Sequence, residues 1–394
     1  PDYIDTKHHA MAAGEESVNL DTFMASGKHV KQLFSRYGNT SDICVAEGVM
    51  GLFDGYDGMK GSSAEIAGLI GIPVVLVLNA KSTAYSVAPV LYGFKHFYPG
   101  IRIVGVVFNF VASEAHYAYL QQACGDAGVE ALGYLPKDDR IVIPSRHLGL
   151  SIDESFCFDA FADRVAGVVD KTVNVDRLLE LCTVDFPVYE EKMTDVSEKT
   201  RIAIARDEAF NFMYRENIEA LRREGKVVFF SPLRDEVLPE ADFLYLPGGY
   251  PELYLSELSA NGKMRSAIRE YCEAGGHVLA ECGGMMYLCD SITGNDSKEY
   301  PMVGVLKQRA TMEQMKLKLG YREVRFEDQV VRGHEFHYSR VLPGDHPLST
   351  IGKVYNAKGI EVDTLIFTYK NVLASYIHFY WGEIGIGYFR EKVK

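Results

Sequence analysis

The chain has 394 residues, of which 47% are hydrophobic and 24% are charged, and its formal net charge is −13. The length suggests roughly two or three domains, and the negative charge argues against a nucleic acid as the main partner. Seven cysteines without a framework spacing predict reduced thiols and a cytoplasmic protein. With no apolar run long enough for a bilayer and no signal peptide, we expect no membrane partner.

The N-terminal half alternates short apolar runs with helical stretches. Strands are predicted at 43–46, 74–78 and 103–108, and helices near 21–37, 86–97 and 114–127. This alternation predicts an α/β domain with a doubly wound parallel sheet, whose ligands collect at the carboxyl ends of the strands. The polar residues at or near such ends are Asp2, Asp5, Glu47, Asp54 and Asn109.

A polar stretch without clear periodicity, Val184–Lys199, predicts a linker to a second α/β domain. The alternation then resumes, with strands at 202–205, 227–230 and 243–246 and a helix near 208–223. We therefore expect one domain at 1–190 and another at 200–394.

In the second half, the apolar run Val278–Ala280 predicts a buried strand that leads into Cys282 and two glycines. A strand, a sharp turn with a nucleophile and a helix form the elbow of α/β enzymes. At such a turn we expect an exposed thiol near a helix N-terminus, which favours the thiolate. The alternative is a buried structural cysteine, but the pair Gly283-Gly284 has no packing purpose of its own.

A cysteine nucleophile needs oxyanion donors and a base. The turn Pro247–Gly249 can aim backbone N–H groups beside Cys282, although alone it is a plain turn. His277 lies at the wrong end of the elbow strand, whereas His378 lies in an apolar strand-like run and needs a partner. The other candidate bases are His334, His337 and His346.

A pair of histidines in the segment GHEFHYS at 333–339 raises the alternative of a metal site. In an extended strand His334 and His337 differ in parity and face opposite sides. A metal site is therefore the less favoured interpretation.

Carboxylates near strand ends in the first half predict a Mg²⁺–nucleotide site, because Mg²⁺ takes oxygen ligands and one or two carboxylates. Glu47 is one candidate, with Asp2 or Asp5 as the second; a solvated loop glutamate is the alternative. Asn109 has the paired donor and acceptor that an adenine edge requires, but asparagine is also a common turn residue.

Taken together, these motifs resemble the cobyrinic/hydrogenobyrinic acid a,c-diamide synthase family of glutamine-dependent enzymes. The resemblance covers nearly the whole chain, and the PDYID opening favours it over the related cobyric acid synthases. The matching motifs are PDYID at 1–5, NLD at 19–21, EGVMGLFDG at 47–55, PSRHLGL at 144–150, ARDEAF at 205–210, FFSPLRDE at 229–236, LPGGYPELY at 246–254, AECGGMMYL at 280–288 and GHEFHYS at 333–339.

The resemblance implies a class I glutamine amidotransferase domain after a dethiobiotin-synthetase-like, P-loop-NTPase-type domain. It implies that Cys282 attacks glutamine, that His378 is the base and that Gly249 and Gly283 hold the oxyanion. ATP and Mg²⁺ would serve an acyl-phosphate route to an amide. The residues implied in the first half are Asp2 and Glu47 for Mg²⁺, Asn109 with Glu47 for the nucleotide, and Tyr3, Ile4, Asp5, Asp54, Arg146 and His147 for the substrate, helped by Lys7, His8 and His9.

The chain departs from the family pattern at two points. No GxxxxGK[ST] phosphate loop occurs in it, so we expect that the chain is truncated, with impaired ATP turnover and surviving glutaminase activity. Tyr380 stands where the family often repeats a histidine, and no HxE pattern supplies a third triad member at His378.

The predicted function is therefore ATP- and glutamine-dependent amidation of the a- and c-acetate carboxylates of cobyrinic or hydrogenobyrinic acid, a tetrapyrrole polycarboxylate, in cobalamin biosynthesis, with a homodimer as one possible assembly. Amidation of nickel sirohydrochlorin is an alternative, because acetate side chains look alike to the amidating site. A second alternative is a non-catalytic binding protein with a degenerate ATP site.

Overall fold

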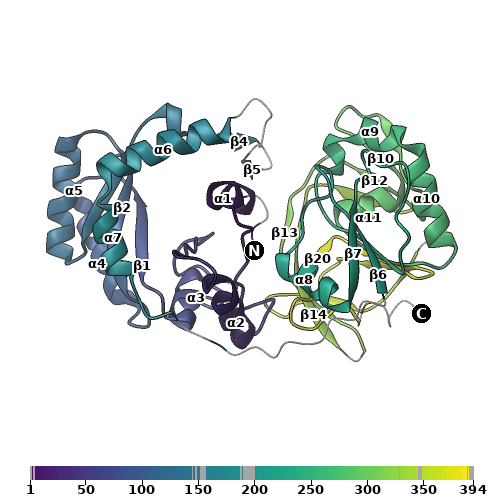
Figure 1. Ribbon diagram of the computed structural model, residues 1–394, viewed down its shortest axis with the longest axis horizontal. Helices are drawn as coiled ribbons and strands as arrows, with labels where there is room; N and C mark the ends of the chain where they lie inside the picture. Colours follow the sequence, from purple (N-terminus) through teal and green to yellow (C-terminus); the bar gives the residue numbers. More distant parts are fainter. Residues whose placement is uncertain are drawn as a thin grey trace. The chain divides into compact units, whose positions relative to one another are not determined.

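The computed structural model describes residues 2, 5–143, 145–146, 149–150, 157–186, 189, 200–327, 329–344, 348–387 and 389. The chain divides into two compact units (Figure 1). One unit comprises Asp2–Leu20 and Val30–Glu190, and the other comprises Pro1, Asp21–His29 and Glu191–Lys394. No helix among the described residues is long and apolar enough to cross a membrane.

The first unit is built on a three-stranded parallel sheet in the order β1-β2-β3, which confirms the predicted strands at 74–78 and 103–108. Its strands are β1 (Val74–Asn79), β2 (Ile103–Val111), β3 (Ala131–Pro136) and the short pair β4 (Ser145–Arg146) and β5 (Gly149–Leu150). Its helices are α1 (Asp5–Ala13), α3 (Ser63–Ile70), η1 (Tyr85–Val87), α4 (Ala88–Phe97), α5 (Glu114–Ala127), η2 (Asp139–Ile141), α6 (Phe158–Thr172) and α7 (Val175–Cys182), with α2 (Gly27–Gly38) crossing the boundary at Val30.

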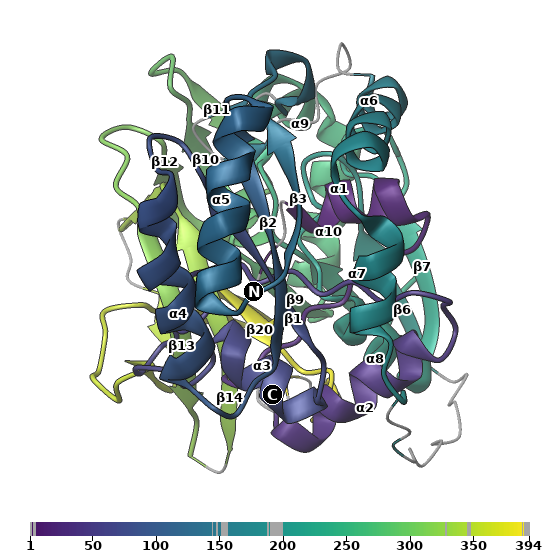
Figure 2. The same ribbon diagram turned by 90° about the vertical axis from the view of Figure 1, so that its left-hand side faces the viewer.

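Helices cover both faces of this sheet, because successive residues of a strand point to opposite sides. Helices α4 and α5 lie on one face of the sheet (Figure 2). Val106 and Phe108 of β2 pack in one cluster with Leu91 of α4 and Leu120 of α5. Val107 faces the other way, toward a smaller cluster that includes residues of α7. The arrangement confirms the α/β prediction for this half.

The predicted strand at 43–46 is wrong, because these residues belong to no regular element. Ile43 and Val45 are 62% and 91% exposed. An apolar run becomes a strand only when a neighbour supplies a hydrogen-bond ladder, and the sheet described here pairs β1 with β2 alone. The helix predicted near 21–37 begins only at Gly27, because Asp21 accepts hydrogen bonds from the N–H groups of Phe23 and Met24 and forms a turn.

The second unit is built on a seven-stranded sheet in the order β16-β18-β19-β9-β8-β6-β7, in which the last five strands run parallel. The strands are β6 (Thr200–Ala205), β7 (Gly225–Phe230), β8 (Phe243–Leu246), β9 (His277–Glu281), β16 (Ser349–Thr350), β18 (Ile366–Tyr369) and β19 (Val372–Ser375). The helices are α8 (Arg215–Glu224), η3 (Pro251–Leu253), α9 (Leu255–Ala260), α10 (Gly262–Glu273) and α11 (Gly283–Leu288).

Two four-stranded sheets complete this unit. An antiparallel sheet has the order β17-β13-β14-β20, and a mixed sheet has the order β11-β10-β12-β15. Their strands are β10 (Cys289–Thr293), β11 (Glu299–Pro301), β12 (Leu306–Thr311), β13 (Lys318–Arg325), β14 (Val330–His337), β15 (Arg340–Leu342), β17 (Lys353–Asn356) and β20 (Ile377–Tyr380).

The helix predicted near 208–223 starts later than expected, at Arg215. The carboxylate of Asp207 accepts hydrogen bonds from the N–H groups of Ala209 and Phe210 and turns the chain instead. Short polar side chains compete with the helix in this way.

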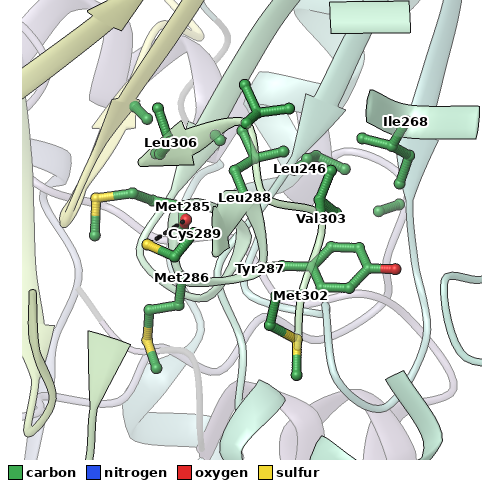
Figure 3. Packing of buried hydrophobic residues seen from close by; sticks show 14 of the residues in the cluster. Leu246, Ile268, Met285, Met286, Tyr287, Leu288, Cys289, Met302, Val303 and Leu306 are labelled. Atoms are coloured by element: carbon green, nitrogen blue, oxygen red, sulfur yellow. Dashed lines mark hydrogen bonds between the residues drawn. The ribbon is translucent and has the colours of Figure 1, made fainter. Parts of the chain in front are cut away.

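Two apolar clusters sandwich the central strand β9. Val278 and Ala280 face a cluster formed largely by the elbow helix α11 and its surroundings, part of which is drawn in Figure 3. Leu279 faces the opposite cluster, which includes residues of α8 and of the antiparallel sheet. Strand β9 is therefore held from both sides, and its carboxyl end is a rigid platform for whatever follows it.

Candidate active site

The residue that follows β9, Cys282, has a strained backbone. Its φ of 44° and ψ of −104° are rare for a residue with a side chain, and it caps the N-terminus of α11. The expectation that the pair Gly283-Gly284 has no packing purpose is wrong, because a Cβ at Gly283 would lie 2.8 Å from Cδ of Pro251 and a Cβ at Gly284 would overlap the carbonyl oxygen of Leu246. A strained conformation costs on the order of 1–3 kcal/mol and is typical of functional sites. The predicted elbow is confirmed.

The expected exposure of the thiol is wrong, because Cys282 is only 5% exposed. Burial raises the pKa of the Cys282 thiol and the nearby carboxyl of Glu252 raises it further, while the N–H of Gly283 donates to the sulfur and opposes them. The sulfur also lies 3.9 Å from the carbonyl oxygen of Phe336, to which it donates. Desolvation outweighs the helix terminus, so the resting group is a thiol and a base has to remove its proton.

The turn at 247–249 packs directly against the elbow. A Cβ at Gly283 would lie 3.1 Å from the backbone nitrogen of Gly249, and a Cβ at Gly249, whose φ is 159°, would overlap the carbonyl of Ala209. Neither position has room for a side chain. The backbone nitrogen of Gly249 therefore lies beside the residue that follows the cysteine.

His378, in β20, contacts the same turn. A Cβ at Gly248 would overlap Cε1 of the imidazole and lie 2.9 Å from its Nδ1. The ring is 1% exposed and stacks on His334, with centroids 5.1 Å apart. Burial, and then the neighbouring His337, lower the pKa of His378 to about 3, so the imidazole is neutral and can accept a proton.

A buried glutamate that the sequence did not single out ties the two strands together. Glu281, next to Cys282, accepts a hydrogen bond at 3.0 Å from the N–H of Phe379, next to His378. Its other oxygen accepts one from Tyr245 at 2.7 Å. Burial raises the pKa of Glu281 to about 8, so the carboxyl is mostly protonated at neutral pH.

A second buried glutamate, Glu335, carries a negative charge. It is 1% exposed and bonds Arg322 at 2.6 Å, Thr364 at 2.7 Å and His337 at 2.7 Å. Burial alone would raise its pKa, but the bond from His337 and the charge of Arg322 lower the pKa of Glu335 to about 2. The negative charge in turn acts to raise the pKa of His378, which favours an imidazolium there.

The remaining candidate histidines have other surroundings. His277 begins β9, at the end opposite the cysteine, and His346 lies outside the described residues. His334 bonds Tyr214, whereas His337 bonds Glu335 and the carbonyl of Ser339, so the two rings have different partners. In the part of the chain that the structure describes, no group of three or more His, Cys, Asp or Glu side chains is arranged to hold a metal ion.

In the other unit, Asp2 and Asp5 are in contact and Glu47 acts on Asp5 electrostatically. The backbone N–H of Asp5 donates to the carboxylate of Asp2, and the main chain of Asp2 is held by two hydrogen bonds with Asn19. Burial raises the pKa of Asp5, and the charges of Asp2 and then Glu47 raise it further. Glu47 pairs with His9 at 2.7 Å. Mutual repulsion of this kind is relieved by a cation.

The other candidates are placed as follows. The predicted strand end at Asn109 is wrong, because β2 continues to Val111; the side-chain oxygen of Asn109 accepts a hydrogen bond from the N–H of Phe110 at 2.8 Å. The carboxylate of Asp54 is exposed beside Gly51. Arg146 is in β4, but its side chain is outside the described part of the chain, as are Tyr3, Ile4 and His147 altogether.

Comparisons with known proteins find relatives over nearly the whole chain. Residues 201–384 match the model of the CobB/CobQ-like glutamine amidotransferase domain. The cobyrinate a,c-diamide synthase of Caldanaerobacter subterraneus subsp. tengcongensis is 40% identical, and the match covers 100% of this chain and 89% of that protein. The synthases of the same name from Saccharolobus solfataricus and Salmonella typhimurium are 35% and 36% identical over 97% of this chain and 89% and 87% of their own lengths.

Proposed function

This chain belongs to the cobyrinate a,c-diamide synthase family, and from that membership we propose its reaction in detail. It is an amide-forming ligase, and the proposed reaction amidates the a- and c-acetate carboxylates of cobyrinic or hydrogenobyrinic acid in cobalamin biosynthesis. Glutamine is the nitrogen donor and ATP is the co-substrate. The observation that carries the proposal is the strained Cys282, joined to the strand of His378 by the Glu281–Phe379 hydrogen bond.

In the amidotransferase half, His378 takes the thiol proton and the sulfur of Cys282 attacks the side-chain amide carbon of glutamine. The backbone N–H groups of Gly249 and Gly283 stabilise the oxyanion of the tetrahedral intermediate. His378 returns the proton to the leaving nitrogen, so ammonia departs and a thioester remains for water to hydrolyse to glutamate. The neutral resting imidazole is free to take up the proton, and the charge of Glu335, which acts to raise the pKa of His378, supports the imidazolium that follows.

Gly248→Ala is expected to lower the kcat of glutamine hydrolysis about a hundredfold, since a misplacement of about 1 Å has that effect. The added methyl group would meet the ring of His378 and push it from its position. Steady-state release of glutamate measures the effect. The control is Gly262→Ala, where a Cβ would meet only Arg265, at 3.9 Å. A Gly248→Ala enzyme with the kcat of the parent would contradict this placement of the base.

In the other half, Asp2 and Glu47 would hold Mg²⁺, which needs only one or two carboxylates because it keeps several waters. Both carboxylates raise the pKa of Asp5, and a cation bound by them would relieve this repulsion. Asp5 and Asp54 orient the acetate carboxylate. By family match, Tyr3, Ile4, Arg146 and His147 contact the substrate, and Asn109 contacts the nucleotide.

ATP supplies the phosphoryl group that turns a carboxylate, a poor electrophile, into an acyl phosphate, and ammonia then displaces phosphate to leave the amide. The two hydrogen bonds with Asn19 fix the backbone of Asp2. These bonds place the carboxylate on a held backbone, as a metal ligand requires.

The proposal is tested with the full gene product, glutamine and Mg-ATP, supplied separately with cobyrinic acid, hydrogenobyrinic acid or nickel sirohydrochlorin. Mass spectrometry of the products is expected to show a diamide of a corrin-type acid that depends on both ATP and glutamine. A diamide of nickel sirohydrochlorin alone would transfer the assignment to that ring. If none of the three is amidated, even with ammonium chloride in place of glutamine, the ligase assignment fails.

A further inference from the structure

A segment from the N-terminal half of the sequence, Asp21–His29, is part of the amidotransferase unit. One oxygen of Asp21 caps the N–H groups of Phe23 and Met24, and the other accepts a hydrogen bond from Tyr321 at 2.5 Å. Phe23 also stacks on Tyr321, with ring centroids 4.5 Å apart. The first residues of the segment are therefore fixed on β13.

The rest of the segment is fixed as well. Arg332 donates to the carbonyl of Phe23 at 3.1 Å, and Ser26 donates to Glu383 through both its N–H and its hydroxyl. The side chains of Phe23, Met24 and His29 are 5–7% exposed. Burial of this extent identifies the segment as a structural part of the unit and not as a passing loop.

From this segment, a line of contacts leads to the ring of His378. The sulfur of Met24 accepts a hydrogen bond from the hydroxyl of Tyr214 at 3.3 Å, and the same hydroxyl bonds Nδ1 of His334 at 2.8 Å. His334 and His378 are cross-strand partners in β14 and β20, and their rings stack at an interplanar angle of 21°.

A second line of contacts reaches the same strand two residues farther on. His29 bonds the hydroxyl of Tyr380 at 2.8 Å, and the ring of Tyr380 packs edge-on against Tyr214, with centroids 5.3 Å apart. Residues two apart in a strand share a face, so Tyr380 and His378 point the same way. Position 380 is where an HxE pattern would place a carboxylate for the base, and a phenol fills it here.

These contacts constrain how the imidazole can move. His334 covers one face of the His378 ring, and the backbone of Gly248 meets its Cε1 edge. The orientation of His334 depends on Tyr214, since a hydrogen bond to one ring nitrogen sets the orientation of an imidazole. Tyr214 in turn bonds Met24 of the segment and packs against Tyr380, which bonds His29 of the segment.

We infer that Tyr214 and His334 are positioning residues for His378 and that Asp21–His29 holds them, so that glutamine hydrolysis depends on a segment outside the amidotransferase sequence match. The inference rests on the proposed role of His378 as the base. It assigns no contact with glutamine to any of these residues, and the expected defect is therefore in turnover and not in binding.

The test compares Tyr214→Phe and Asp21→Ala with the parent in the full-length protein. Tyr214→Phe keeps the packed ring and loses only the hydroxyl, while Asp21→Ala removes the two caps and the bond to Tyr321. Each is expected to lower the kcat of glutamine hydrolysis about tenfold, part of what a general base contributes, with KM for glutamine within about twofold of the parent. Alkylation of Cys282 by iodoacetamide is expected to slow in parallel.

The control is Tyr369→Phe, which removes a phenol bonded to Glu273 at the surface of the same unit and is expected to leave kcat unchanged. Far-UV circular dichroism and melting temperature establish that the variants are folded. Parent-like kcat and alkylation rates in both test variants would overturn the inference and leave the proposed function standing. A parent protein that releases no glutamate would instead remove the proposed function itself.

Discussion

Cys282→Ala is expected to abolish glutamate release, with a loss of at least about a thousandfold, because removing a nucleophile from a Cys–His site leaves only binding and the oxyanion donors. The strained backbone of the elbow remains, since alanine at φ 44° has the same conformation to adopt. Glutamine therefore still binds and is not cleaved. Amide formation with ammonium chloride is expected to persist, because that nitrogen source bypasses the thioester.

The matched control for this variant is Cys289→Ala. Cys289 is a fully buried cysteine of the same apolar cluster, drawn in Figure 3, and its thiol donates to the carbonyl of Met285. Its replacement is expected to lower stability without changing the rate of glutamate release by more than about twofold, since it has no place in the chemistry. Glutamate release at the parental rate by Cys282→Ala would remove the nucleophile assignment.

Glu335→Ala is expected to lower the free energy of unfolding by about 3–5 kcal/mol, the typical effect of removing one partner of a buried ion pair. Arg322, 8% exposed, would lose its carboxylate partner, and Thr364 and His337 would each lose an acceptor. Urea unfolding at pH 7 measures the difference. The surface pair of Lys353 with Glu361 offers a control, where Glu361→Ala is expected to change stability by less than about 1 kcal/mol.

The same carboxylate predicts a pH dependence. Its pKa is about 2 in the folded protein against an ordinary value of 4.5, so the unfolded chain binds the proton more tightly. The stabilisation is fully present above about pH 4.5 and is lost as the pH falls toward 2. As the pH falls between these limits, the difference in free energy of unfolding between the parent and Glu335→Ala is expected to shrink. Parallel stability curves for parent and variant across this range would contradict the lowered pKa.

Much of the fold follows from local pattern, and the exceptions have identifiable causes. The strands at 74–78, 103–108 and 243–246 are apolar runs bounded by turn residues, and each occurs as predicted. The run at 43–46 has the same pattern and forms no strand, because pairing is a property of the neighbours and not of the run. Helix starts shifted where an aspartate, such as Asp207, capped a turn instead.

At the site, the elbow was predictable because two glycines beside a cysteine indicate a turn too tight for side chains. The burial of Cys282 was not, since the covering residues come from distant strands, as the contact with Phe336 illustrates. Glu335 lies inside the motif that was considered for its histidines, and no local feature indicates that Arg322 and Thr364 surround it. Partners of buried charges are set by tertiary packing, which a single sequence does not display.

The docking of Asp21–His29 also bears on how this protein can be engineered. A hybrid enzyme made by exchanging only the matched residues 201–384 would separate the transferred amidotransferase domain from the nine residues of Asp21–His29, which contact Tyr214 and Tyr380. A domain exchange between relatives should therefore transfer Asp21–His29 together with the amidotransferase domain, so that Asp21 still bonds the Tyr321 of its own protein. Recombination points chosen from the sequence match alone would miss this requirement.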